Sequence, residues 1–333
     1  MHNYLINIVR IVFLFFSASR NMKRQKSFVK KHLIPIVENA KQNNDGTLNN
    51  EDFRRINTYA VTIPAMLGEA FCQLRGRQMS DNERLAITFL GSITGLFDDL
   101  FDSKNLSPDY IKNLLNKPEE SNALNSNERL IIELYRLGLT YSDKSELIRK
   151  YALNVYEAQL QSQKQCGPKL HKETIKQITY NKGGVSIPLY RCAFDDAITD
   201  AEYDLLYSLG AIGQLENDIF DIYKDYSEHI QTMATTEINI LNLKNQYHNL
   251  MNDIFQLIDN THYLECRKRK FRYFVALIVG RGLVGLNQLH KLSRKTEGRF
   301  LPEKYSRKEL ICDMEQPLNL LRLIHYAAIY AKK

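Results

Sequence analysis

The sequence predicts an all-α protein, because helical hydrophobic spacing covers most of the chain and no series of short alternating strands interrupts it. From Arg84 to Phe101, apolar residues recur every three or four positions, which is the helical period. Residues that cap helices precede several such stretches, and the chain contains only 8 prolines and 15 glycines. We therefore expect about ten or more helices in one body.

The first predicted element is an amphipathic segment, "YLINIVRIVFLFF", from Tyr4 to Phe16. It is too short to span a membrane and is interrupted by Arg10. We assign residues 1–21 to an N-terminal amphipathic segment and residues 22–333 to a helical domain. The favoured interpretation is a helix packed on the body, and the alternative is a helix lying on a membrane surface. Its polar face carries Asn3, Asn7, Arg10 and Ser17.

The later helices are predicted from their starts. A capping box, Ser80 to Glu83, opens the helix that continues to Phe101, and a second box, Thr199 to Glu202, opens a long helix from Asp200 to about Asp225. Further helical patterns begin near Pro108, Ser126, Asp143 and Lys172.

Composition excludes several classes of protein. The 45 lysines and arginines exceed the 38 acidic residues by seven, but no zinc finger, aromatic RNA-binding motif or basic stripe is present, so we expect no nucleic-acid partner. The five cysteines are widely spaced and form no Cys-x-x-Cys pair. This usage predicts reduced thiols in a cytoplasmic protein rather than a disulfide framework.

Acidic residues interrupt an apolar stretch at "ITGLFDDLFD", where Asp98, Asp99 and Asp102 lie among core-type residues. On a helix, Asp98 and Asp102 share a face with the small residues Gly91 and Gly95. Carboxylates in apolar surroundings are costly unless they are paired or bound to a metal. No matching set of lysines or arginines falls on this face.

A second acidic stretch, "GAIGQLENDIFDIYKD", repeats the plan of glycines followed by carboxylates. Asn217, Asp221 and Asp225 are spaced four apart on one helical face, and Asp218 flanks them. Oxygen-only ligands on rigid helices suit Mg²⁺. Several Mg²⁺ ions held between two such helices would bind a diphosphate, and a glycine-lined apolar space behind them would take a hydrocarbon chain.

These motifs resemble those of the class I terpenoid synthase superfamily, which includes terpene cyclases and trans-prenyl diphosphate synthases. "DDLFD" matches its first motif, DDxxD, and "NDIFDIYKD" resembles the cyclase motif (N/D)DxxSxxxE. The metal-binding positions of that second motif correspond to Asn217, Asp221 and Asp225. "NDIFD" is also similar to the second DDxxD of chain-elongating enzymes. The resemblance in order and spacing covers about residues 81–296 and implies a single all-α domain around a central pocket, with three Mg²⁺ ions.

The resemblance also implies residues that bind the diphosphate and the prenyl chain. "YNKGGVSIPL" resembles the family's broken helix, with Lys182 as the basic residue and Gly183 and Gly184 at the kink. Arg294, with Arg299 as a second choice, would be the diphosphate-binding arginine in the late region "GLNQLHKLSRK". Four aromatic residues would line the pocket and stabilise a carbocation through their π faces: Phe97, Phe101, Tyr180 and Tyr207.

The chain departs from elongating enzymes at the site for a second diphosphate. Those enzymes carry an arginine pair soon after the first motif, whereas this chain continues "SKNLSPDYIK", and the early pair Arg54 and Arg55 lacks the family's context. This difference favours a single-substrate cyclase or lyase. The alternatives are a trans-prenyl diphosphate synthase and a catalytically silent helical homologue that acts as a binding module.

Two other motifs are interpreted as structural. "GRGLVG" (residues 280–285) matches G-x-G-x-x-G but lacks the following strand and acidic residue of a dinucleotide site, so we expect close helix packing or further pocket lining. Asp195 and Asp196 precede a capping box and are expected in a solvated turn.

The predicted function is therefore Mg²⁺-dependent ionisation of an allylic prenyl diphosphate (farnesyl, geranylgeranyl or longer) to form a terpene. Lys182 and Arg294 would bind the departing diphosphate, and Gly184 would belong to the substrate-binding region. The oligomeric state is left open, with a homodimer as one alternative. The predicted metal ligands are Asp98, Asp102, Asn217, Asp221 and Asp225, with Asp99 and Asp218 as outer or alternate ligands.

Overall fold

The computed structural model of the chain describes residues 2–101 and 106–331, and these residues form helices joined by turns and loops. The described residues contain no strand, which confirms the predicted all-α class and is consistent with a fold of the class I terpenoid synthase type. Contacts are concentrated in two compact units. Unit 1 comprises Met1–Leu14, Gln161–Ile187 and Thr199–Lys333, and unit 2 comprises Phe15–Leu160 and Pro188–Ile198.

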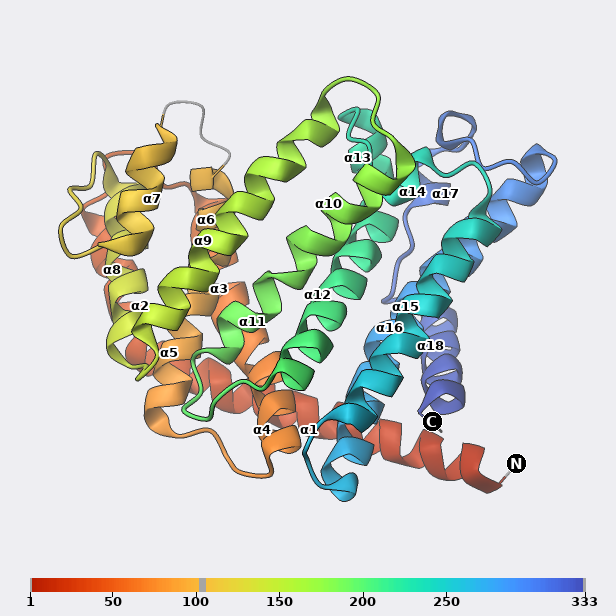
Figure 1. The fold of residues 1–333 in the computed structure, drawn as a ribbon, viewed down its shortest axis with the longest axis horizontal. Coiled ribbons are helices and arrows are strands. Elements are labelled where there is room, and N and C mark those ends of the chain that lie inside the picture. Colours follow the sequence, from red (N-terminus) through yellow and green to blue (C-terminus); the bar gives the residue numbers. More distant parts are fainter. Residues whose placement is uncertain (1, 102–105, 332–333) are drawn as a thin grey trace. The chain divides into compact units, whose positions relative to one another are not determined.

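Figure 1 labels the elements in chain order. The first half of the chain contains α1 (His2–His32), α2 (Ile34–Gln42), α3 (Asn50–Thr62), the π-helical turn η1 (Ile63–Gly68), α4 (Glu69–Arg75), α5 (Asp81–Ser92), α6 (Thr94–Phe101), α7 (Pro108–Asn116), α8 (Ser126–Thr140) and α9 (Ser145–Ser162). The second half contains η2 (Gln163–Cys166), α10 (Lys172–Gly184), α11 (Ser186–Arg191), α12 (Asp200–Phe220), α13 (Ile222–Ser227), α14 (Met233–Thr236), α15 (Ile240–Asn260), α16 (Glu265–Ser293), η3 (Arg294–Thr296), η4 (Pro302–Lys304), α17 (Arg307–Leu310) and α18 (Pro317–Tyr330).

In unit 2, α5 is the central helix and packs against α3 and α8. Its start is the predicted capping box: the Ser80 hydroxyl accepts from the Glu83 amide, and the Glu83 carboxylate accepts from the Ser80 amide. These two bonds satisfy backbone donors that the first turn of a helix leaves unpaired. The rest of α5 is almost entirely buried, so the apolar period seen in the sequence does correspond to core.

The predicted continuous helix from Arg84 to Phe101 is wrong in one respect, because it breaks at Ile93 into α5 and α6. At the break, the Ser92 and Thr94 hydroxyls donate to the carbonyl oxygens of Phe89 and Gly91. Such local side-chain bonds compete with the helical ladder. Asp98 therefore lies on a short separate helix, one turn after Thr94.

The predicted cavity-lining role of Gly91 and Gly95 is also wrong. A Cβ atom at Gly91 would lie 3.2 Å from the Tyr59 carbonyl oxygen, and one at Gly95 would lie 3.3 Å from Arg55 and Tyr59. Both glycines thus allow close packing against α3.

In unit 1, α10 and α12 run side by side (Figure 1). Their contact is close because Gly183 and Gly210 face each other: a Cβ atom on either glycine would overlap the carbonyl oxygen of the other. Gly210 therefore packs on α10. The prediction from the sequence that it lines a cavity is wrong. In contrast, a Cβ atom at Gly213, one turn later, would meet nothing within 4 Å.

The long helix predicted from Asp200 is capped as expected by Thr199, whose hydroxyl accepts from the Glu202 amide at 3.2 Å. It ends at Phe220 instead of continuing to Asp225. Asp221 (φ −90°, ψ 9°) interrupts it, and α13 follows directly. The second acidic motif therefore spans this interruption.

At the C-terminal end of unit 1, α16 packs against α15 and α18 (Figure 1). The G-x-G-x-x-G match lies within α16, where a Cβ atom at Gly280 would contact Leu323, one at Gly282 would contact Tyr247, and one at Gly285 would contact Ile219. The expectation of close helix packing is confirmed.

The N-terminal helix α1 is longer than predicted. It has 31 residues and passes through residue 21 without interruption. By length and composition, the stretch Tyr4–His32 is long and apolar enough to cross a membrane, so the expectation that it is too short is wrong.

Candidate active site

The second acidic motif lies where α12 gives way to α13. Asn217 is exposed at the last turn of α12, and its side-chain amide donates to Asp221 Oδ2 at 3.2 Å. The Asp225 amide donates to the Asp221 carbonyl at 2.9 Å, which keeps helical spacing across the interruption. The predicted four-residue spacing therefore does join Asn217 and Asp221.

Asp218 is buried and directed toward α10. Its two carboxylate oxygens accept from Thr179 Oγ1 at 3.0 Å and from Gln214 Nε2 at 2.9 Å. Burial raises the pKa of Asp218 to about 6, against the opposing effects of these two bonds and of the Lys182 charge. This carboxylate is already engaged within unit 1, and its role as an outer or alternate metal ligand stays a prediction.

Asp225 is 9% exposed. Burial raises its pKa to about 7, and the neighbouring charges of Asp218 and Asp221 add to the effect, while Lys224 opposes it. The motif therefore holds three carboxylates that repel one another, with cations that only partly compensate them.

Lys182 lies on α10 near this acidic group, as shown by its electrostatic effect on Asp218. It is half-buried and stands just before the end of α10 at Gly184, after which Val185 separates α10 from α11. The helix thus breaks beside the glycine pair, where the resemblance places a kink. Gly184 itself is buried, and a Cβ atom there would overlap the Tyr207 ring.

The first motif belongs to unit 2. Asp98 and Asp99 are exposed on α6, and Asp102 lies outside the described residues. Asp99 forms an ion pair with Arg55 of α3, which also pairs with Asp52. The charge of Asp98 acts on Tyr190, whose hydroxyl is 2.7 Å from Thr94 Oγ1.

Phe97 and Phe101 are buried in an aromatic cluster of unit 2. The Phe97 ring lies 5.6 Å from that of Tyr135, and the Phe101 ring lies 5.1 Å from that of Tyr156. These edge and tilted contacts are favourable core packing. Contact of either ring with a substrate stays a prediction.

Tyr180 and Tyr207 line an open pocket of about 610 Å³ in unit 1. The other lining residues are mostly polar: Gln161, Lys164, Glu173, Thr174, Lys176, Gln177, Ile178 and Asn181. Among the described residues, the lining includes neither Lys182 nor the carboxylates of the second motif. Lys176 lies 5.7 Å from the Tyr180 ring centroid, and burial raises the pKa of Tyr180 to about 12. The two tyrosines therefore share this pocket with polar residues and not with the acidic motif.

Arg294 and Arg299 are exposed in the segment that follows α16. Arg294 Nη2 lies 3.5 Å from His290 Nε2, on the preceding turn. Their predicted role toward a diphosphate stays a prediction.

Several residues beside the second motif were missed by sequence reasoning. Thr179 and Gln214 hold Asp218. Arg281 of α16 pairs with Glu216 at 2.8 Å and lies 4.5 Å from the Phe220 ring centroid. The other carboxylate oxygen of Glu216 is buried without a hydrogen-bond partner among the described residues, and burial raises the pKa of this group to about 7. Only proximity in the fold reveals these contacts.

The residues of the second motif fit Mg²⁺ by the chemistry of their donor atoms, although they do not form a ready metal site. The described residues place no group of three His, Cys, Asp or Glu side chains close enough for a ready metal site. The second motif supplies an amide and carboxylates, because its first position is Asn217, and Asp218 is turned away into α10. Asn217, Asp221 and Asp225 nevertheless offer the hard oxygen donors that Mg²⁺ prefers, and a cation would relieve the repulsion between the two carboxylates.

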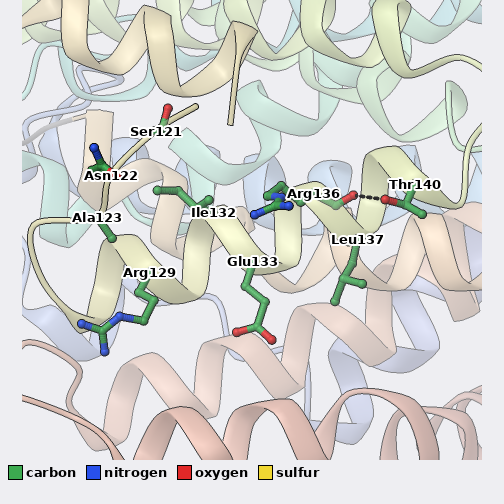
Figure 2. A pocket seen from close by; sticks show the side chains of 9 residues that line it. All are labelled: Ser121, Asn122, Ala123, Arg129, Ile132, Glu133, Arg136, Leu137 and Thr140. Carbon is green, nitrogen blue, oxygen red and sulfur yellow. Dashed lines mark hydrogen bonds between the residues drawn. The ribbon is translucent and has the colours of Figure 1, made fainter. Parts of the chain in front are cut away.

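A second pocket, of about 610 Å³, lies on α8 in unit 2, and Figure 2 shows its nine lining residues. It contains Arg129, Glu133 and Arg136 but no residue of the predicted site. Burial raises the pKa of Glu133. Its lining contains one acidic residue, Glu133, and therefore differs from the clustered carboxylates of the acidic motifs.

Comparison with known proteins gives one partial similarity. The chain matches no family model. It is 28% identical over 179 residues to a protein described as the tryptophan prenyltransferase ComQ of Bacillus spizizenii. The matched region covers 50% of this chain and 59% of that relative. Over half its length, this helical chain is therefore similar to an enzyme whose name describes transfer of a prenyl group to tryptophan.

Proposed function

We propose that the protein is an enzyme that ionises an allylic prenyl diphosphate and transfers the prenyl group to an indole ring. The observation that carries the proposal is the acidic cluster on α12 and α13, with Lys182 beside it on the broken helix α10. The similarity to a tryptophan prenyltransferase supports the prenyl group as the part transferred.

The site residues would act on the diphosphate end of the substrate. Asn217, Asp221 and Asp225 would hold Mg²⁺, the role that the resemblance also assigns to Asp98 and Asp102 of the first motif, and bound Mg²⁺ would neutralise charge on the leaving diphosphate. Lys182 would bind a diphosphate oxygen and stabilise the charge that grows there as the C–O bond breaks. Thr179 and Gln214 would fix Asp218 so that the helix end keeps its geometry.

An uncharged acceptor of the prenyl group agrees with the sequence, which lacks the motifs that bind a second diphosphate in elongating enzymes. The stretch after the first motif, "SKNLSPDYIK", carries no arginine. The early Arg55 is engaged by Asp52 and Asp99. An indole carries no phosphate and needs neither anchor, whereas isopentenyl diphosphate would require one.

The second candidate is terpene formation without an acceptor. It is supported by Asn217, Asp221 and Asp225, which occupy the first, fifth and ninth positions of the cyclase motif. In that reaction the prenyl cation would lose a proton or be trapped by water, whereas in prenyl transfer the indole ring would attack the cation and the indole would then lose a proton.

The test is diphosphate release by the purified full chain with Mg²⁺ and geranyl, farnesyl or geranylgeranyl diphosphate. Each substrate is supplied alone, with tryptophan, with a tryptophan-containing peptide, or with isopentenyl diphosphate. We expect a prenyl mass increment on the tryptophan or the peptide, and none on a matched peptide with phenylalanine in place of tryptophan. A volatile or alcoholic terpene formed without acceptor would support the second candidate, and longer diphosphates would mean chain elongation.

Matched variants test the site. Asn217→Ala and Lys182→Ala should lower diphosphate release by about 10²-fold or more, whereas Asp204→Asn, an exposed change on the same helix α12, should leave it unchanged. No release with any substrate would contradict an enzymatic function and favour a binding module.

A further inference from the structure

The N-terminal helix α1 presents its apolar side to solvent. Exposed fractions are 57% for Leu5, 53% for Val9, 67% for Phe13 and 63% for Phe16. With Val12, these residues recur every three or four positions and form one face, here called the apolar face. A contiguous exposed apolar patch of this kind marks an interaction surface more often than scattered single residues do.

The polar side of the same helix is the one bound to the protein. In unit 1, the Asn7 amide donates to the Ala328 carbonyl at 2.9 Å, and the Tyr273 hydroxyl donates to Asn7 Oδ1 at 2.7 Å. Arg10 donates to the Tyr273 hydroxyl at 2.7 Å, and the Tyr4 hydroxyl lies 2.8 Å from His325 Nδ1. The helix cannot roll to bury its apolar face without breaking these bonds, so the orientation is maintained.

The charge of α1 defines what would cover the apolar face. The helix contains seven lysines and arginines and no acidic residue, and all seven are exposed. The remaining 38 basic residues equal the 38 acidic ones, so the whole net charge of +7 belongs to this helix. By the helical period, Arg20, Lys23, Lys30 and Lys31 continue the line of the apolar face.

We propose that α1 docks on an anionic lipid surface, with its apolar face in the acyl boundary and its basic residues at the headgroups. An apolar stripe followed by exposed cations is the pattern of an interfacial helix. A second copy of the chain is a poor occupant, because pairing two such helices would bring two sets of seven like charges together. A spanning orientation would break the hydrogen bonds of Asn7 and Arg10.

The test is co-sedimentation of the purified full chain with vesicles of phosphatidylcholine alone or mixed with phosphatidylglycerol. We expect binding to the anionic vesicles that weakens as salt is raised. The double variant Phe13→Glu with Phe16→Glu should reduce it by about tenfold or more. Leu321→Glu, an equally exposed change on α18 at 63%, is the matched control and should bind normally.

A charge variant and an assembly measurement complete the test. Lys23→Glu with Lys30→Glu should remove the preference for anionic lipid, while circular dichroism verifies that the fold is kept. The proposal would be overturned if the protein bound both vesicle types equally and the Phe13 and Phe16 substitutions left that binding unchanged. A dimer that the Phe13 and Phe16 substitutions dissociate, together with no vesicle binding, would overturn it in favour of a second copy. Vesicle binding that resists extraction with alkaline carbonate would overturn it in favour of a spanning helix.

Discussion

Individual carboxylates of the second motif differ in what the fold allows them to do. Asp218 is satisfied by Thr179 and Gln214, whereas Asp225 is buried beside two other acids and has its pKa raised to about 7. The two aspartates therefore differ, because hydrogen bonds satisfy Asp218 while Asp225 lies among like charges. Asp225, which most needs a counter-charge, is one of the carboxylates that the resemblance assigns to metal.

Cation binding by this cluster is testable without catalysis. Mg²⁺ should raise the melting temperature of the protein, because it binds the folded state and relieves carboxylate repulsion. Asp225→Asn should stabilise the metal-free protein by about 1–2 kcal/mol and gain less from Mg²⁺. Thermal unfolding with and without Mg²⁺ measures both effects, and Asp204→Asn should behave as the unaltered chain. An equal Mg²⁺ response in Asp225→Asn would argue against this assignment.

Asp45 provides a pH-dependent contact away from the site. Its carboxylate accepts from the Thr47 hydroxyl at 2.6 Å and from the Ser126 amide at 2.9 Å, and the Thr47 bond is the main cause that lowers its pKa to about 2. A depressed folded-state pKa contributes stability above the unfolded value of about 4. That contribution is lost as pH falls toward 2.

Asp45→Asn should therefore destabilise the protein at neutral pH, with a difference from the unaltered chain that disappears near pH 2. Urea unfolding at a series of pH values measures it. A difference that stays constant with pH would show that the Asp45 charge is not responsible.

At the scale of elements, glycines set how closely α10 and α12 approach. Gly183→Ala should lower the free energy of unfolding by about 1–3 kcal/mol, because the added Cβ overlaps the Gly210 carbonyl. Gly213→Ala on α12 is the matched control: it meets nothing within 4 Å and should be neutral or stabilising by up to about 1 kcal/mol. Denaturant unfolding compares them, and similar effects of the two changes would contradict this packing.

At the scale of the whole molecule, the hypothesis to test is that both acidic motifs contribute to diphosphate release. Asp98→Ala and Asn217→Ala should each lower diphosphate release by about 10²-fold or more. If both residues act on the same group, the double variant should lose much less than the product of the single losses. Fully multiplicative losses in the release assay would indicate independent roles.

Much of the fold was predictable from local chemistry. The capping residues Ser80 and Thr199 do begin α5 and α12, and the glycine pair before Val185 does mark the end of α10. These signals operate within one or two helical turns, so a single sequence carries them. The acidic spacing of the second motif was visible for the same reason.

The sequence by itself determined the helical class, the helix starts and the acidic motifs, because each depends on neighbours a few residues apart. Only the tertiary structure decided which faces are covered. Gly91, Gly95 and Gly210 have the spacing of pocket-lining residues but pack against other helices, and Asp99 pairs with an arginine 44 positions away. The exposed apolar face of α1 follows the same rule. Amphipathic spacing defines two sides of a helix, and only the packing partners determine which side turns inward.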